Sequence, residues 1–383
     1  MTHPLPSGWQ EVKLGDIANI TMGQSPKSEF YNKEKNGLPF LQGSSTFGYT
    51  YPTFNIYSSD IKKIAKNGSI LMSVRAPVGD INIANTDICI GRGLCSINAN
   101  NKSINNYIFY ILKYYKNNLL NNQKGTTFGA ITKDDIINLD VIIPPLEEQK
   151  RIAEVLSLCD EVIENLTELI DKKEQYKKGV MQRVLSGEVR FKGFTDEWKT
   201  VKLKDILIAG SKDRVNDTSK YKKITIKLHN KGIEFANIER KMADKRPFYI
   251  RKKDEIIIGK QNYFNGSIAI VNEEFDNTIC SNAIMSFKVN NSCNNKFIYS
   301  LLSRESYMKK YYHLANGTGQ KELSENDFFN FTLSVPSLEE QKKIAGLLSA
   351  IDEDIENLKK QLELRKQQKK GLMQKLLTGE VRV

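Results

Sequence analysis

The sequence has few residues that bind metals or form disulfides. Its 383 residues include five cysteines and three histidines, and no two of the cysteines form a Cys-x-x-Cys pair. The cysteines are odd in number and scattered, which argues against a disulfide framework and against a zinc site. They are Cys89, Cys95, Cys159, Cys280 and Cys293; the histidines are His3, His229 and His313.

Long apolar runs are also missing. No stretch of about 18 apolar residues occurs, and residues 1–10 lack a basic segment followed by an apolar one. The sequence therefore predicts a cytoplasmic protein without a membrane partner.

The motifs of several enzyme classes are absent or incomplete. There is no Gly-x-x-x-x-Gly-Lys-Ser/Thr phosphate loop, and Gly91-Arg92-Gly93 has no third glycine in step. The one Pro-Pro pair, Pro144-Pro145, lacks the flanking amide or acidic residue and the aromatic residue of a methyltransferase loop. A nuclease triplet such as Asp60-Ile61-Lys62 has no paired acidic residue before it. We predict that the chain is not itself a catalyst.

Positive charge is in excess. Lysine and arginine total 57 against 45 acidic residues, a formal charge of +12. Such a balance favours a polyanionic partner such as nucleic acid, although charge alone is equally typical of a basic protein without one.

The sequence contains an internal repeat. Residues 144–191 align without a gap onto residues 336–383 at a constant offset of 192, and 27 of the 48 positions are identical. A weaker match joins the segments that begin at Trp9 and Trp198. Between these anchors the two halves diverge almost completely. One body plan was copied, and its two globular parts then became different.

The repeated segments have the pattern of long helices. In the first copy Ile152, Leu156, Cys159, Ile163 and Leu166 alternate steps of four and three, and the second copy matches them. This is a heptad seam, typical of helices that pack lengthwise. A helix from Glu147 to Ser186 would be roughly 60 Å long at 1.5 Å per residue. Two ordinary amphipathic helices in a larger core would give a similar pattern, but the matching lengths favour antiparallel pairing of the two segments with each other.

Charged residues interrupt both seams at equivalent places. Lys173 and Lys177 stand in the first copy, and Arg365 and Lys369 in the second. We interpret the far part of each helix as less tightly paired, or as meeting other surfaces.

The divergent segments are mixtures of short strands and helices. Residues 69–74 and 79–84 read as two strands around a loop, and residues 255–259 and 266–271 correspond to them. Residues 104–116 and 296–312 look helical and rich in aromatic residues. Such an aromatic stripe is more often part of a core than a platform on which bases stack.

At this point the pattern resembles a known family. Two divergent domains, each followed by a helix that begins Pro-x-Leu-Glu-Glu-Gln-Lys and ends Gly-Glu-Val-Arg, are similar to the specificity subunit of type I restriction-modification enzymes. The resemblance covers essentially the whole chain and is strongest at residues 144–190 and 336–382. A scaffolding protein is the alternative, but it would not need two basic, loop-rich domains.

The resemblance implies an α+β fold with two globular target-recognition domains, joined and spaced by two long helices that form an antiparallel coiled coil with a pseudo-twofold repeat. We expect the first recognition domain at residues 1–143 and the second at 192–335. The spacer helices are expected at 144–191 and 336–383.

The resemblance also implies partners. Each domain would read one half of a split, asymmetric site in double-stranded DNA, and the helices would fix the spacing and bind two modification subunits. The modification subunits of the family bind S-adenosylmethionine, and motor-nuclease subunits, which use ATP and Mg²⁺, join them. This chain itself is expected to bind no cofactor and no metal.

Polar residues in the loops are candidate DNA contacts. Arginine and lysine suit guanine edges, whereas asparagine and glutamine suit adenine edges. The candidate base readers are Arg75 and Arg92 in the first domain and Lys260, Gln261, Asn262 and Asn265 in the second. Two polar loops that contain glycine supply the candidate phosphate contacts, although such loops are as often plain surface turns. These residues are Lys124, Thr126, Thr127, Gln320 and Lys321.

Overall fold

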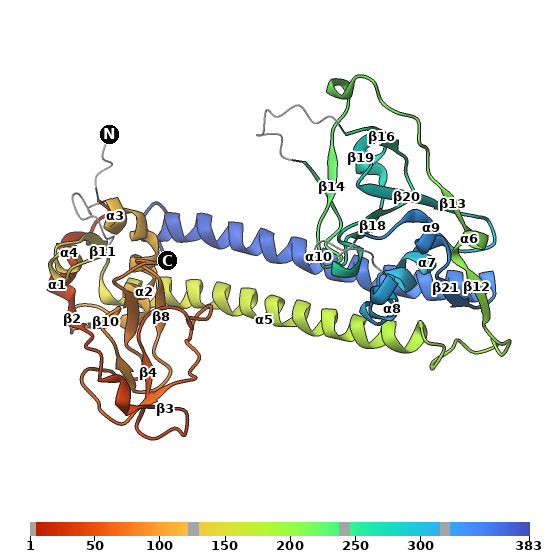
Figure 1. Ribbon diagram of the computed structural model, residues 1–383. Helices are drawn as coiled ribbons and strands as arrows, with labels where there is room; N and C mark the ends of the chain where they lie inside the picture. The colour runs from red at the N-terminus through yellow and green to blue at the C-terminus, as the bar shows by residue number, and fades with distance from the viewer. Residues whose placement is uncertain (1–4, 122–129, 237–245, 315–321) are drawn as a thin grey trace. The chain divides into compact units, whose positions relative to one another are not determined.

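The computed structural model describes residues 5–121, 130–236, 246–314 and 322–383 (Figure 1). The chain divides into two compact units: Met1–Ile170 with Leu358–Val383, and Asp171–Asn357. The first unit combines two separated segments of the sequence, whereas the second is one continuous segment. Each contains one variable domain, the first part of the long helix that follows this domain, and the last part of the other long helix.

Both variable domains share one frame. A two-stranded sheet joins the start of each domain to its end, and a four-stranded antiparallel sheet has the order β2-β10-β7-β8 in the first domain and β13-β20-β17-β18 in the second. The elements of the first frame are β1 (Gln10–Lys13), α1 (Leu14–Ile17), β2 (Ala18–Met22), β7 (Ile70–Ser73), β8 (Ile81–Ile83), β10 (Leu94–Ala99), α4 (Lys133–Ile137) and β11 (Asp140–Ile143). Those of the second are β12 (Lys199–Lys202), α6 (Leu203–Ile206), β13 (Leu207–Ala209), β17 (Ile256–Gly259), β18 (Ile268–Ile270), β20 (Ile284–Val289), α9 (Glu325–Phe329) and β21 (Thr332–Val335).

The two domains differ around this frame. The first adds a five-stranded sheet of order β3-β5-β4-β9-β6, whereas the second adds two separate two-stranded sheets. The added elements of the first are η1 (Ser28–Phe30), β3 (Tyr31–Asn32), β4 (Leu38–Leu41), β5 (Tyr57–Ser58), β6 (Ile64–Ala65) and β9 (Ile88–Ile90). Those of the second are η2 (Thr218–Lys220), β14 (Ile224–Ile226), β15 (Ile233–Phe235), β16 (Phe248–Arg251), η3 (Tyr263–Asn265), η4 (Glu273–Phe275) and β19 (Thr278–Ser281).

The aromatic helices belong to the core, as predicted. In α2 (Asn105–Tyr114) Tyr107, Phe109 and Tyr110 are buried against the sheet of the first domain. Helix α3 (Lys116–Asn121) follows. The rings of Tyr107, Phe109 and Tyr110 are therefore not available as a platform on which bases stack.

The single helix predicted over residues 296–312 is instead broken into α7 (Asn295–Leu302), α8 (Glu305–Tyr311) and η5 (Tyr312–Leu314). Side chains from elsewhere in the domain take the carbonyl groups at the end of α7. Tyr263 Oη donates to the Leu302 carbonyl at 2.9 Å, and Asn230 Nδ2 donates to the Ser303 carbonyl at 3.0 Å. These tertiary bonds replace the helical ones that would have continued α7, and no periodic pattern signals them.

The long helices are α5 (Leu146–Val184) and α10 (Leu338–Leu377). They pack antiparallel in each unit and contribute to both cores. The core of the first unit includes Ile152 and Leu156 from the start of α5, together with Leu376 and Leu377 from the end of α10. The second core has the equivalent set, Ile344 and Leu348 with Val184 and Leu185. Each variable domain is therefore completed by parts of both helices.

Ion pairs join the start of one helix to the residues that follow the other. Arg382 forms a bidentate contact with Glu148 at 2.9 and 2.7 Å, and Trp9 Nε1 donates to the same carboxylate at 3.2 Å. In the second unit Arg190 holds Glu340 in the same way, at 2.9 and 2.7 Å. The hydrogen bonds from Arg382 lower the pKa of Glu148. The repeated Leu-Glu-Glu-Gln and Gly-Glu-Val-Arg motifs are thus the two halves of one contact.

The glutamine of each motif ties its helix to the neighbouring domain. Gln149 Nε2 donates to the Pro144 carbonyl at 2.9 Å, and Ser103 Oγ donates to Gln149 Oε1 at 2.7 Å. Gln341 repeats this with the Pro336 carbonyl at 2.9 Å and the Asn294 N–H at 2.8 Å. Both glutamines are buried.

Of the two interpretations of the charged seam positions, looser pairing is wrong for the lysines, because each pairs with an aspartate of the other helix. Contact with another surface is confirmed for Lys369, whose ammonium lies over the Tyr49 and Tyr110 rings of the first variable domain at 5.7 and 5.3 Å. Lys173 pairs with Asp354 at 2.6 Å, and Lys177 pairs with Asp352. In the first unit Lys369 pairs with Asp160, where both side chains are almost fully buried. Arg365 is exposed and bonds Gln368 of its own helix at 2.9 Å. The helices therefore pair through charge where the apolar seam stops.

Among the described residues, no helix has the length and apolar character needed to cross a membrane.

The two repeated ion pairs predict unequal contributions to stability. By the repeat, Asp160 and Lys369 correspond to Asp352 and Lys177. The side chains of the first pair are 7% and 10% exposed, and those of the second are 54% and 28% exposed. Burial works to raise the pKa of Asp160, but hydrogen bonds from Lys369 and Tyr49 outweigh it and leave the pKa below its usual value.

We expect Lys369→Met to lower the free energy of unfolding by about 3 to 5 kcal/mol, because it leaves Asp160 buried without its partner. Lys177→Met, at the exposed pair, should change it by less than about 1 kcal/mol. Chemical denaturation monitored by circular dichroism measures both. Equal losses in the two variants would contradict the distinction, and the double variant Asp160→Leu/Lys369→Met should recover part of the loss.

Candidate nucleic-acid interface

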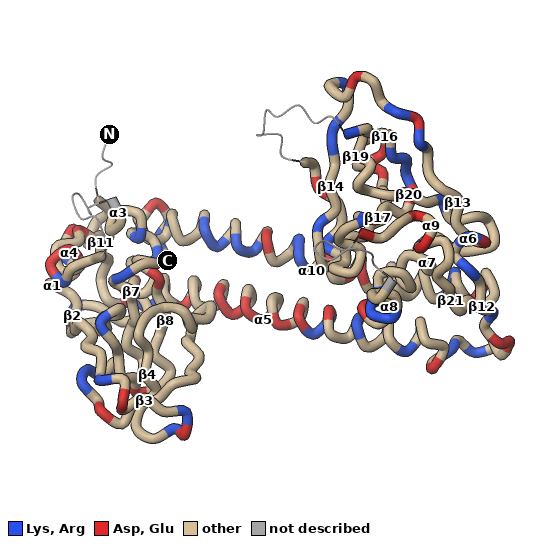
Figure 2. Tube along the Cα trace, in the orientation of Figure 1, with Lys and Arg blue, Asp and Glu red and all other residues tan. Residues whose placement is uncertain are grey.

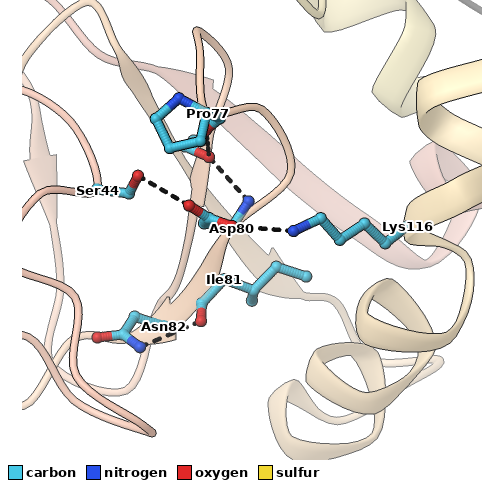
Figure 3. Close-up of polar contacts among 7 residues, drawn as sticks. Ser44, Pro77, Asp80, Ile81, Asn82 and Lys116 are labelled. Atoms are coloured by element: carbon cyan, nitrogen blue, oxygen red, sulfur yellow. Dashed lines mark hydrogen bonds and ion pairs between the residues drawn. The ribbon is translucent and has the colours of Figure 1, made fainter. Parts of the chain in front are cut away.

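Arg75 lies in a loop whose two ends are held by hydrogen bonds. This loop joins β7 to β8 and contains a cis bond at Ala76–Pro77. Ser73 Oγ donates to the Pro77 carbonyl at 2.7 Å and accepts from the Asp80 N–H at 2.8 Å. The Asp80 carboxylate in turn accepts from Ser44 Oγ at 3.1 Å and from Lys116 Nζ at 2.9 Å (Figure 3). The loop is anchored while the Arg75 side chain is exposed.

Arg92 lies at the same end of the sheet as Arg75. The β7–β10 ladder pairs Ser73 with Leu94, and beyond it the Val74 N–H donates to the Gly93 carbonyl at 2.9 Å. Antiparallel register then brings Arg92 opposite Arg75. A Cβ atom at Gly93 would lie 2.3 Å from the Gln42 carbonyl oxygen, so the turn requires glycine. The structure therefore brings the two predicted base readers of the first domain together.

The second domain places its loop on the same frame. The Lys260 N–H donates to the Ala283 carbonyl at 3.0 Å, and the Lys260 carbonyl accepts from Leu323 at 2.9 Å. Val74 makes the same two bonds, to Gly93 and from Ile131 at 2.9 Å. Val74 and Lys260 are thus equivalent positions. It follows that Gln261 corresponds to Arg75, and Asn282 to Arg92.

Asn282 is a candidate that sequence reasoning missed. It is exposed and precedes Ala283, as Arg92 precedes Gly93. Its equivalence to Arg92 comes from the sheet, in which the strands that follow, residues 94–99 and 284–289, take the same register. The loops themselves share no residue pattern that would have aligned them.

Buried contacts hold the other predicted residues of the second loop. Tyr263 is fully buried, and Gln261, Asn262 and Asn265 around it are exposed, while Lys260 is half-buried. Asn265 Nδ2 donates to Asn262 Oδ1 at 3.3 Å, so these two amides are partly engaged with each other.

A hairpin tip packs on this loop and was not predicted. The His229 N–H donates to the Asn265 carbonyl at 2.8 Å, and the Asn230 N–H donates to the Gly266 carbonyl at 2.9 Å. His229 and Asn230 have φ values of 60° and 57°. Because His229 and the neighbouring Lys231 are exposed beside the candidate readers, this tip extends the polar surface.

The predicted phosphate contacts are not located. Lys124, Thr126, Thr127, Gln320 and Lys321 lie outside the described residues. Within the described part of the chain, no group of three or more His, Cys, Asp or Glu side chains is placed to hold a metal ion.

Comparison with known proteins decides the family. The model of the type I restriction modification DNA specificity domain matches residues 6–175 and again residues 195–366. The chain belongs to this family. The two matches account for the internal repeat and confirm the resemblance that the sequence motifs indicated.

Relatives from Methanocaldococcus jannaschii agree with this. The provisionally named type I restriction enzyme MjaX specificity subunit is 44% identical over 191 residues, which is 49% of this chain and 45% of that protein. The chain thus aligns with about half the length of this relative. The type I restriction enzyme MjaVIII specificity subunit is 25% identical, covering 99% of this chain and 94% of that protein.

A solved structure confirms the fold. The S subunit of a type I restriction-modification system from M. genitalium superposes with a TM-score of 0.66 at 18% identity, covering 98% of this chain and 97% of that one. The prediction of an α+β fold with two long packed helices is therefore confirmed. Membership in a family of specificity subunits also confirms the prediction that the chain is not itself a catalyst.

The equivalence of the two loops predicts separable effects. We expect Arg75→Ala to cost about 1 to 3 kcal/mol of discrimination at one base pair in one half of the target, and Gln261→Ala to do so in the other half. Binding to duplexes with single base-pair changes measures both effects. Arg183→Ala, which removes an exposed arginine of α5 outside both loops, is the matched control. A loss spread over both halves, or over neither, would show that these side chains are not base readers.

Proposed function

We propose that this chain is the DNA-reading subunit of a type I restriction-modification complex, in which each variable domain recognises one half of a bipartite, asymmetric target. The observation that carries the proposal is one frame with two different sets of side chains. Arg75 and Arg92 occupy the positions that Gln261 and Asn282 occupy in the other domain. Arginine suits guanine, and glutamine or asparagine suits adenine, so the halves of the target should differ.

The long helices would serve two further roles. They would set the spacing between the half-sites and bind two modification subunits. Exposed apolar side chains on one face of α5 support the binding role: Leu158, Val162 and Leu169 are 62%, 44% and 40% exposed. Their spacing of four and seven residues places them on one stripe. The equivalent positions of α10 are Ala350, Asp354 and Gln361, so this stripe belongs to the first repeat.

The chemistry of the complex would belong to its partners. Modification subunits would carry S-adenosylmethionine, and motor-nuclease subunits would carry ATP and Mg²⁺. This chain would contribute affinity for DNA and selection of the target, through side chains that its frame holds in place. It would carry no cofactor of its own. We also propose the cytoplasm as its location.

Methylated adenines in cells test the proposal. A cell that expresses this chain with its modification subunit should carry one split methylation motif that is absent from a cell without the chain. Replacing residues 1–140 with those of a relative should change one half of the motif and leave the other. A stable complex that adds no chain-dependent methylation would instead favour a scaffolding role.

The spacing role has its own test. Because ion pairs hold α5 and α10 in register, a change in length must be made in both helices. Matched deletions of residues 165–168 and 361–364 remove about 6 Å from each helix. We expect the spacer of the methylation motif to shorten by about one or two base pairs, at 3.4 Å each, with both half-sites unchanged. Alanine at the same eight positions, which keeps the length, is the control. An unaltered spacer in a folded deletion variant would refute the ruler.

A further inference from the structure

We propose that a lysine-lined pocket in the first unit binds a phosphate of the DNA backbone. The pocket has a volume of about 150 Å³ and is bounded by Tyr49, Lys113, Lys366, Lys369 and Lys370. Tyr49 and Lys113 come from the variable domain, and the other three lysines come from the last part of α10. This inference rests on the proposed function and adds a contact outside the base-reading loops.

The charges in the pocket are unbalanced. Four ammonium groups line it, and Asp160 and Glu164 are the carboxylates that act on Lys113 and Tyr49. One of the two, Asp160, is already held by Lys369 and by Tyr110 Oη, which donates to it at 2.8 Å. Lys366 and Lys370 remain exposed at the mouth of the pocket. A singly charged diester fits such an excess of positive charge.

Of the four lysines of the pocket, Lys113 is the one that a bound anion would stabilise most. Its ammonium lies over the ring of Phe109 at 4.1 Å and over that of Tyr49 at 5.4 Å. Among the described residues it has no carboxylate within ion-pair distance. Burial, followed by repulsion from Lys369, lowers the pKa of Lys113 to about 8. A phosphate in the pocket would relieve that repulsion and favour the charged form.

The pocket adjoins the candidate base-reading loop. Tyr49 belongs to a segment that is bound to β8, where Asn82 Nδ2 donates to the Gly48 carbonyl at 3.0 Å and the Ile83 N–H donates to the Thr50 carbonyl at 2.9 Å. Ser44 of the same segment holds Asp80, which closes the Arg75 loop (Figure 3). A duplex read by Arg75 would therefore pass close to the pocket, which favours DNA over a protein carboxylate as the occupant.

Among its described residues the second unit lacks this cluster, although the helices are so similar. The repeat places Glu174 where α10 has Lys366, and the equivalence of Asn105 with Asn295 places Ser303 where α2 has Lys113. Lys177 and Lys178 are the two lysines that remain. The C-terminal half of α10 carries a dense series of basic residues in Figure 2. Residues 359–366 differ from residues 167–174 at every position, and Lys366 is the last of them. The pocket in the first unit thus owes Lys366 and Lys113 to positions at which the two repeats differ.

The salt dependence of DNA binding tests the proposal. The experiment uses the full chain in complex with its modification subunit, with a duplex containing the methylated motif and an unrelated duplex of equal length. For Lys366→Gln/Lys370→Gln we expect the slope of log K against log [KCl] to fall by about 1 for both duplexes, since one phosphate contact is lost. The ratio of the two affinities should stay the same.

The control removes the same charge elsewhere on the helices. Lys178→Gln/Lys360→Gln changes two exposed lysines, and Lys178 is the repeat equivalent of Lys370. It should leave the slope as in the parent protein. A duplex series in which single phosphates are replaced by uncharged methylphosphonates locates the contact. The parent should lose affinity at one position, and the pocket variant should lose none there.

Each other outcome overturns the inference. Equal slopes for the pocket variant and the control would show that the pocket meets no phosphate. Normal DNA binding with weakened binding of the modification subunit would assign the lysines to an acidic protein surface instead. Neither result affects the proposed function, which fails separately if the parent complex shows no preference for the motif.

Discussion

Two carboxylates at the starts of the long helices, Glu148 and Glu340, hold the architecture together. Each is buried, and each accepts hydrogen bonds from the arginine that follows the end of the other helix. A carboxylate in such a place is costly unless it is paired, so the contact specifies which helix end meets which domain. The antiparallel arrangement of the helices and the composite cores are both consistent with this pairing of carboxylate and arginine. The motif that first revealed the repeat is therefore a structural contact, and not part of the candidate nucleic-acid interface.

The contact also explains why the sequence changed so unevenly. The helix segments must match each other across the pair, because a change in Glu148 would leave Arg382 without its partner. The loops after β7 and β17 make no such cross-contact with the residues that the structure describes. They can exchange arginine for glutamine, or a Pro-containing turn for a 3₁₀ turn, while the frame bonds of Val74 and Lys260 stay the same. Specificity can vary where the frame does not depend on it.

The helices, their pairing and the paired strands around each loop could be predicted, because heptads and alternating apolar runs are local patterns. The break between α7 and α8 could not, since Tyr263 and Asn230 create it from distant positions. The seam lysines were misread for a similar reason: an isolated lysine in a heptad looks like a defect until Asp160 or Asp352 is placed beside it. At the candidate site, Arg75 and Arg92 were each chosen by residue type alone. Their proximity, and the role of Asn282, required the register of the sheet.

The composite cores have a consequence for the order in which the protein is made. Domains generally fold as units while the chain is synthesised from its N-terminus. Here the first variable domain is complete early, yet Leu376 and Leu377, which finish its core, are synthesised only after the whole second variable domain. The second unit, Asp171–Asn357, has all of its parts sooner. The domain that is made first is thus the one whose packing finishes last, and until then its apolar surface for α10 stays open to other chains.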